Sequence, residues 1–322
     1  MLSRNFICGA LLAAAPVLAP CAMAGTVLQL ASVETPQTAW GQAAQRFADG
    51  VAEASGGELR VELALSGTTG SPRETLEALT IGTNDIVLTV IASLNPYDPL
   101  PGIESYPYLI RDPGHFDRVY NGPVGAELYD EIAKRTGFRM IGAGARGARE
   151  MASKSPVNSV EDLKGLKIRV PNIDIFRATW QILGASPTPM SSSEVYTGLQ
   201  SGIIDAVENP LSAHVRSKYY EAAEYVVMTD HVYGAYTFIF DQARFDSLTD
   251  EERAIIEEEG RKALRWGSGM ELENAEESRA TLEAAGATFL EPDLGPFREK
   301  LAAMAGEFPD LAPWVGKIQA VE

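Results

Sequence analysis

Two arginines occupy positions at which a permanent positive charge is unexpected. Arg149 lies at the start of one predicted strand, and Arg169 lies inside another, in the segment 166–171 (LKIRVP). A planar guanidinium that is always charged is out of place in a strand unless an anion meets it. That anion is either an internal carboxylate or the carboxylate of a bound molecule, and the residues alone leave both alternatives open.

The sequence lacks the familiar signatures of catalytic and metal sites. It contains no HExxH, no Walker A loop, no GxSxG and no EF-hand loop, and its three histidines, His115, His214 and His231, lack metal-ligand spacing. The segment 142–147 (GAGARG) matches GxGxxG, but Pro156 follows too closely for the helix that would hold a pyrophosphate. We instead expect a glycine-rich strand that crosses between two lobes, with no metal site and no cofactor.

Composition and charge restrict the classes of partner. The chain has 322 residues, with 27 Lys and Arg against 44 Asp and Glu, a formal net charge of −17 and 45% hydrophobic residues. This is the composition of a globular protein. Because an acidic chain without a basic patch repels phosphate backbones and anionic headgroups, we expect no nucleic-acid partner and no membrane-surface role.

The N-terminal segment predicts export. Arg4 precedes an apolar run over 6–18 that ends in Ala-Met-Ala at 22–24, which is typical of a signal peptide comprising residues 1–24. The run is shorter than the roughly 20 apolar residues that cross a bilayer, and no later stretch is long enough. The sequence therefore predicts a soluble, periplasmic protein after cleavage.

Both cysteines, Cys8 and Cys21, lie inside this segment, so the mature chain has no disulfide, thiolate metal site or cysteine nucleophile. The alternative is a lipoprotein anchored through Cys21. Pro20 disfavours it, because proline stiffens the chain just before the cleavage site.

Strands and helices are expected to alternate around the two arginines. Strands are predicted at 27–31, 58–65, 85–90, 138–142, 166–170 and 203–207, and helices at 40–55, 72–81, 113–135, 174–183 and 193–201. A capping box at 249–252 predicts a last helix that continues to Ala285; about 35 residues at a rise of 1.5 Å would be roughly 50 Å long.

Two tandem α/β units predict two lobes with a cleft between them. The first lobe is expected to comprise 25–147 with about 235–270, and the second 148–234 with part of the C-terminal helical region. Residues from about 248 to 322 would form a helical brace across both lobes and the C-terminal region. Near-continuous apolar strands favour mixed, mostly parallel sheets flanked by helices.

Several segments resemble one family. These are 165–171 (GLKIRVP), 187–210 (PTPMSSSEVYTGLQSGIIDAVENP), 147–150 (GARE), 67–79 (GTTGSPRETLEAL) and 244–252 (RFDSLTDEE). They are similar to the DctP-type solute-binding proteins of tripartite ATP-independent periplasmic (TRAP) transporters. The resemblance implies a two-lobed α/β, periplasmic-binding-protein-like fold that closes on an organic acid and delivers it to membrane permease subunits.

The resemblance also implies roles for particular residues. Arg169 aligns with the arginine that pairs bidentately with the ligand carboxylate, Asn209 with an amide that supports the same carboxylate, and Arg149 with a second cationic contact. Glu74 aligns with a position that often faces ligand hydroxyls, although its place in a capping box already accounts for it.

One position departs from the family pattern. Ser192, within 190–194 (MSSSE), occupies a position where the family often has an aromatic ring, so a wall of the site is missing there. Tyr233 and Tyr236 are candidates to supply a ring, although aromatic residues in a strand are more often core.

These observations predict a monomeric binding protein, not an enzyme, that captures a small organic-acid anion such as a carboxylate, dicarboxylate or sugar acid. One alternative is an exported hydrolase or lyase that uses paired carboxylates or His231. Another is a receptor subunit for a sensory membrane protein with the same binding site. The identity of the acid does not follow from the sequence.

Overall fold

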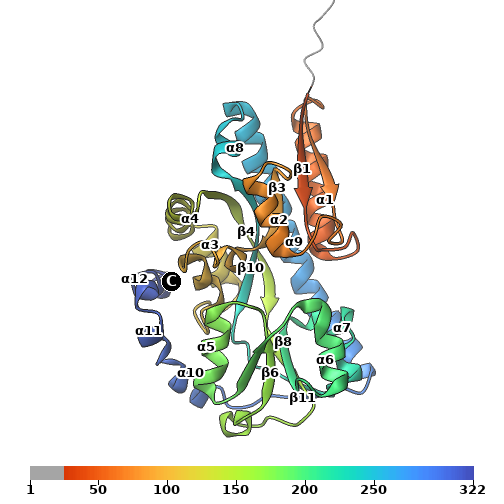
Figure 1. The fold of residues 1–322 in the computed structure, drawn as a ribbon, viewed down its shortest axis with the longest axis vertical. Coiled ribbons are helices and arrows are strands. Elements are labelled where there is room, and N and C mark those ends of the chain that lie inside the picture. The colour runs from red at the N-terminus through yellow and green to blue at the C-terminus, as the bar shows by residue number, and fades with distance from the viewer. Residues whose placement is uncertain (1–24) are drawn as a thin grey trace, which may run out of the picture.

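Two mixed β-sheets form the framework of the computed structural model, which describes residues 25–322; the predicted signal peptide at 1–24 lies outside the described residues. The first sheet has the strand order β2-β1-β3-β10-β4 and the second the order β11-β9-β5-β8-β6-β7 (Figure 1). The strands are β1 (Thr26–Ala31), β2 (Leu59–Ala64), β3 (Ile86–Val90), β4 (Phe138–Ala148), β5 (Glu150–Ser153), β6 (Lys167–Val170), β7 (Ser186–Pro189), β8 (Ala206–Asn209), β9 (Tyr225–Val227), β10 (Tyr233–Asp241) and β11 (Thr288–Leu290).

Each sheet combines parallel and antiparallel pairs. In the first, β1 pairs in parallel with β2 and β3, while β10 runs antiparallel to β3 and β4. In the second, β6 is parallel to β7 and β8, and β5 is antiparallel to β8 and β9. The predicted α/β class with mixed sheets is therefore confirmed.

Helices cover both sheets. They are α1 (Ala39–Ala54), α2 (Pro72–Thr80), α3 (Pro113–Tyr120), α4 (Pro123–Thr136), α5 (Asp174–Leu183), α6 (Val195–Ser201), α7 (Leu211–Arg216), α8 (Gln242–Asp246), α9 (Asp250–Ala284), α10 (Gly295–Leu301), α11 (Met304–Glu307) and α12 (Ala312–Gln319). Short 3₁₀ turns are η1 (Ile91–Leu94), η2 (Leu100–Ser105), η3 (Val160–Leu163), η4 (Ser192–Glu194), η5 (Tyr219–Glu221) and η6 (Pro309–Leu311). Among the described residues, no helix combines the length and apolarity needed to cross a membrane.

The predicted helix at 113–135 was wrong in one respect, because the structure has two helices there. α3 ends before Asn121, and α4 begins after the N-cap Gly122. Pro123, the first residue of α4, has no backbone N–H to donate to the preceding turn, so it is favoured at a helix start and not within a helix.

β4 is longer than the predicted strand at 138–142. Pairing with β10 carries the strand through Gly142 and Gly147, which have φ angles of 63° and 82°, as far as Ala148. The strand predicted at 203–207 begins later, at Ala206, because the chain first completes the turn after α6.

Two segments connect the sheets directly, and α9 runs beside both. β4 ends at Ala148 and β5 starts at Glu150, while the segment before β10 returns alongside, with the Arg149 N–H donating to the Val232 carbonyl at 2.9 Å. α9 contacts α1 and β4 of the first sheet's layer and α7 beside the second sheet (Figure 1). Gly267 permits this packing, because a Cβ there would lie 2.7 Å from Cζ3 of Trp40.

Candidate functional site

A cavity of about 930 Å³ lies between residues of the two sheets' layers. Its walls come from the segment after β1, the end of β3 and one face of α2 on one side, and from β6, β8, α5 and η4 on the other. The strand ends of an open α/β sheet are where ligands usually bind in this class of fold. The cavity also contains most of the residues that the sequence singled out.

Arg169 lies on β6 at the bottom of this cavity, with 5% of the residue exposed. Its Nε and Nη2 both donate to the Met190 carbonyl, at 2.9 and 2.7 Å. No carboxylate in the described residues lies within ion-pair distance of it. Burial lowers the pKa of this guanidinium. The Met190 carbonyl thus accepts from the Nε–Nη2 edge of the guanidinium and leaves both N–H groups of Nη1 and the second N–H of Nη2 for a partner in the cavity.

Arg149 has an internal partner. Its Nη2 donates to Oε1 of Glu208 at 2.7 Å and to the Glu208 carbonyl at 2.8 Å, while its Nε pairs with Oε2. His231 lies 3.1 Å from the same Oε2 through its Nε2, and the Arg149 guanidinium lies 4.9 Å from the centre of the Phe176 ring. Arg149 therefore lines the cavity while its guanidinium is engaged in a buried ion pair with Glu208.

The carboxylate of Glu208 is held ionised by this arrangement. Burial raises its pKa, but the charge of Arg149 and the hydrogen bond with His231 outweigh burial and lower the pKa to about 2. Glu208 is fully buried on β8, one residue before Asn209, so the salt bridge and the cavity wall belong to the same strand.

Asn209 faces the cavity from β8, with 7% exposed. In the described part of the chain its side-chain amide has no hydrogen-bond partner. An amide offers both a donor and an acceptor, so this group is available to a bound molecule beside Arg169.

Ser192 is exposed and lines the cavity as the first residue of η4; Ser191, not Ser192, is the N-cap there. Four aromatic residues from other segments line the cavity, namely Tyr97, Phe176, Tyr219 and Tyr236. The Tyr236 ring stacks on Trp40 at 4.7 Å. Aromatic surface is therefore present in the cavity although Ser192 supplies none.

Glu74 and Tyr233 do not line the cavity. Glu74 is exposed, and its Oε2 accepts the Ser71 N–H at 2.7 Å; this hydrogen bond lowers its pKa, in keeping with the capping interpretation. Tyr233 packs against the hydrophobic core, and burial raises its pKa to about 12. The structure thus places neither side chain where it would meet a molecule beside Arg169.

Sequence reasoning missed six charged residues of the cavity wall, namely Glu34, Arg73, Glu77, Glu104, Arg146 and Arg216. Glu34 and Glu104 are buried, and Arg146 is half-buried on β4. Arg146 belongs to the GAGARG segment, but its pattern was tested only for phosphate binding. Nothing in the local sequence marks Glu34 or Glu104 as a neighbour of β4, which lies roughly 40 to 110 residues further along the chain.

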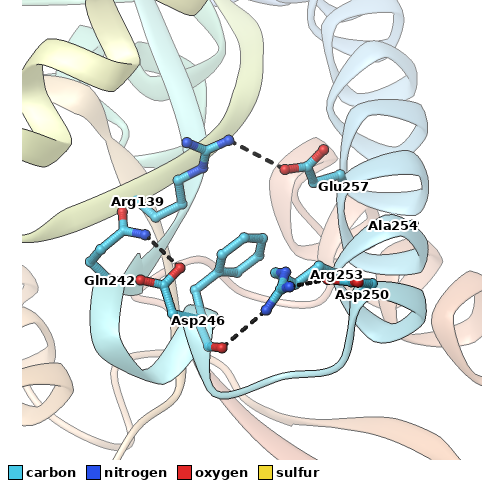
Figure 2. Close-up of a pocket in the computed structure, with 8 residues that line it drawn as sticks. Arg139, Gln242, Asp246, Asp250, Arg253, Ala254 and Glu257 are labelled. Carbon is cyan, nitrogen blue, oxygen red and sulfur yellow. Dashed lines mark hydrogen bonds and ion pairs between the residues drawn. The ribbon is translucent and has the colours of Figure 1, made fainter.

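A second cavity, of about 590 Å³, lies on the surface between β4, α8 and the start of α9 (Figure 2). Its arginines are already engaged. Arg139 pairs with Asp130 at 3.0 Å and Glu257 at 3.3 Å, and Arg253 donates to the Asp246 carbonyl at 3.0 Å. In residues 25–322 no group of three or more His, Cys, Asp or Glu side chains is arranged to hold a metal ion.

Comparison with known proteins gives one consistent result. The model of the family described as bacterial extracellular solute-binding protein, family 7 (DctP), matches residues 30–309. A solute-binding protein of Roseobacter denitrificans is 32% identical over 290 residues, 89% of both chains, and its structure with bound L-galactonate has a TM-score of 0.84, covering 92% of this chain and 99% of that one. The sialic acid-binding periplasmic protein of Vibrio cholerae is 32% identical over 284 residues, 86% of this chain and 87% of the relative.

A TRAP periplasmic solute-binding protein of Xanthobacter autotrophicus, with bound β-D-galacturonate, is 28% identical, with a TM-score of 0.86 over 92% of this chain and all of that one. The predicted resemblance to DctP-type proteins is confirmed.

Proposed function

The chain belongs to family 7 of the bacterial extracellular solute-binding proteins, the DctP family, and from that premise we propose that it captures a sugar acid in the cavity between its sheets and delivers it to TRAP membrane subunits. It is a binding protein and not an enzyme, as predicted. The alternative of an exported hydrolase or lyase has no support in these relatives.

The observation that carries the proposal is the unpaired charge of Arg169. Removing a cation from water without a counter-charge costs several kcal/mol, and a hydrogen bond to a carbonyl only partly offsets that cost. A ligand carboxylate that accepts from the remaining N–H groups of Nη1 and Nη2 would supply the missing charge through short, charge-assisted bonds. Arg149 is satisfied by Glu208 and has no comparable need.

The cavity supports a sugar acid over a smaller acid. A volume of about 930 Å³ lies near the upper end of the range for small-molecule sites, roughly 300–1,000 Å³, and exceeds what a four-carbon acid would fill. The amide of Asn209 and the carboxylate of Glu34 line the wall, and such groups bind hydroxyls. L-galactonate and β-D-galacturonate, bound by two of the relatives, are molecules of this kind.

Capture by closure of two lobes is part of the proposal. The first lobe would comprise 25–147 with about 235–270, and the second 148–234 with part of the C-terminal helical region. Residues from about 248 to 322 would form the helical brace and the C-terminal region. The segments near Gly147 and at 233–234 would absorb the change in backbone angles, as short hinges do in proteins that close on a ligand. The left-handed φ of Gly147 supports this assignment.

The periplasm is the proposed location, reached through cleavage of the signal peptide at 1–24. Delivery to the membrane subunits would follow closure, because only the closed protein holds its bound solute shielded from bulk water.

Titration calorimetry with D-galacturonate, D-glucuronate and L-galactonate tests the function. Wild-type protein is expected to bind at least one of them and not galactitol, which lacks a carboxylate. Arg169→Lys should weaken binding by about 2–5 kcal/mol, thirtyfold or more, since lysine cannot donate two parallel hydrogen bonds to one carboxylate. Arg177→Lys is the matched control, because Arg177 is 44% exposed on α5 and pairs only with Asp174. Unchanged binding by a folded Arg169→Lys variant would contradict the proposal.

A further inference from the structure

Arg146 has an unusual environment for a half-buried arginine. It lines the cavity, yet in the described residues its guanidinium makes neither an ion pair nor a hydrogen bond. Arg149 and Arg169, which also line the cavity, each have a fixed protein partner. Of these three arginines, Arg146 therefore has the largest number of unengaged N–H donors.

The backbone directs this side chain. β4 pairs Ala145 with Ala235 and Ala148 with Tyr233, so β4 has one more residue than β10 between these pairs. The extra residue makes a β-bulge at Arg146 and Gly147, and Gly147 has the positive φ that such bulges use. Bulges change the direction of a side chain on a strand, and here they direct Arg146 to the cavity wall.

The aliphatic part of the Arg146 side chain (its stem) also has a defined position. A Cβ on Gly234 would lie 3.6 Å from Cβ and 3.7 Å from Cδ of Arg146, so the stem passes over the bare backbone of Gly234. The guanidinium lies 5.4 Å from the centre of the Tyr236 ring, within the range of a cation–π contact. The head group is thus held in position without any of its N–H donors being used.

Carboxylates surround this guanidinium beyond contact distance, and each is bound elsewhere. Glu34 accepts from the Tyr236 hydroxyl, Glu104 accepts the Ala235 N–H at 2.7 Å, and Glu271 accepts from a serine hydroxyl of α7 at 3.1 Å. Burial opposes the charge of Arg146, but Tyr236 together with these carboxyl groups outweighs burial and raises its pKa. A second carboxylate at Arg146 would have to share its surroundings with three carboxyl groups, whereas neutral hydroxyls would accept from the guanidinium and donate to Glu34 or Glu104.

We propose that Arg146 is a specificity-determining contact that binds hydroxyls of a sugar acid carrying a single carboxylate, the carboxylate lying at Arg169. The inference rests on the proposed function and adds a distinction to it: aldonates and uronates are accepted, and aldarates, which have a carboxylate at each end, are rejected.

The test measures affinities of wild type, Arg146→Gln, Arg146→Lys and Arg169→Lys for D-galacturonate, L-galactonate and the matching dicarboxylate galactarate. Wild type is expected to bind galacturonate or galactonate at least tenfold more tightly than galactarate. Arg146→Gln should weaken binding of the monocarboxylates at least tenfold and narrow that ratio. Arg146→Lys keeps the charge but loses the fork, so it should weaken them by about fivefold or more.

The outcomes separate the two proposals. If Arg169→Lys loses binding while both Arg146 variants bind as wild type, the proposed function holds and the role of Arg146 is overturned. Tighter wild-type binding of galactarate overturns the hydroxyl assignment, because it would indicate a second carboxylate at Arg146. If wild type binds none of the three acids, both proposals fail. Melting temperatures within about 2 °C of wild type establish folding, and Arg146→Lys serves if Arg146→Gln does not fold.

Discussion

Removal of the negative charge of Glu208 should destabilise the protein more than any exposed charge substitution. Glu208→Gln keeps the shape of the side chain but leaves Arg149 buried without a counter-charge. It also replaces a carboxylate by an amide opposite His231. Breaking a buried ion pair at one partner typically costs about 3–5 kcal/mol, because the remaining charge is then uncompensated.

The pKa of Glu208 gives a second, independent magnitude. The pKa lies at about 2, against an ordinary value of 4.5, so the difference at 1.36 kcal/mol per unit is about 3 kcal/mol. The pKa is lowered in the folded state, so this contribution is present in full above about pH 4.5 and is lost as the pH falls through about 2. By pH 3 more than half of it should be gone.

Urea unfolding at pH 7, 5, 4 and 3 measures this directly for wild type, Glu208→Gln and a control, Glu283→Gln. Glu283 pairs with Arg279 on α9 and is 53% exposed, so its loss should cost less than about 1 kcal/mol. The free energy of unfolding of Glu208→Gln should lie about 3 kcal/mol below wild type at pH 7, and the gap should narrow toward pH 3. A gap below 1 kcal/mol at pH 7, or one that does not change with pH, would refute the reasoning.

Three further outcomes are expected. Gly267→Ala should lower the free energy of unfolding by about 1–3 kcal/mol, because its Cβ would meet the Trp40 ring. A Cβ at Gly269, on the same helix, meets nothing within 4 Å, so Gly269→Ala should raise the free energy of unfolding by up to about 1 kcal/mol. Urea unfolding compares the two variants, and equal effects would exclude the Trp40 contact as the cause. Ser192→Phe should leave the melting temperature of the ligand-free protein within about 2 °C of wild type but weaken binding of the bulkiest acid that the protein accepts by about tenfold or more. Calorimetry with acids of graded size measures this effect. A loss of stability with unchanged relative affinities would contradict the cavity role of Ser192. Small-angle scattering should detect a smaller radius of gyration with a saturating sugar acid than without, and superimposable curves would rule out closure.

Local sequence determined much of the fold around the site. The α5 helix lies at the predicted 174–183, and β1, β2 and β3 lie within a residue or two of their predicted bounds. These elements are specified by near-neighbour signals, namely caps, turn residues and the spacing of apolar residues, which act within one or two turns of the chain. The motifs near Arg169 and Asn209 were likewise sufficient to identify the family.

Tertiary structure alone decided which arginine is paired. The residues alone left open whether the anion that meets each arginine is internal or bound. The fold separates them, because β5 pairs with β8 and brings Glu208 to Arg149 while β6 leaves Arg169 beside a carbonyl. The bulge that directs Arg146 likewise arises from β10, almost 90 residues away. The register of strands from distant segments determines which charged side chains meet. The free energy of a buried charge depends on the groups around it in space, not on its neighbours in the chain.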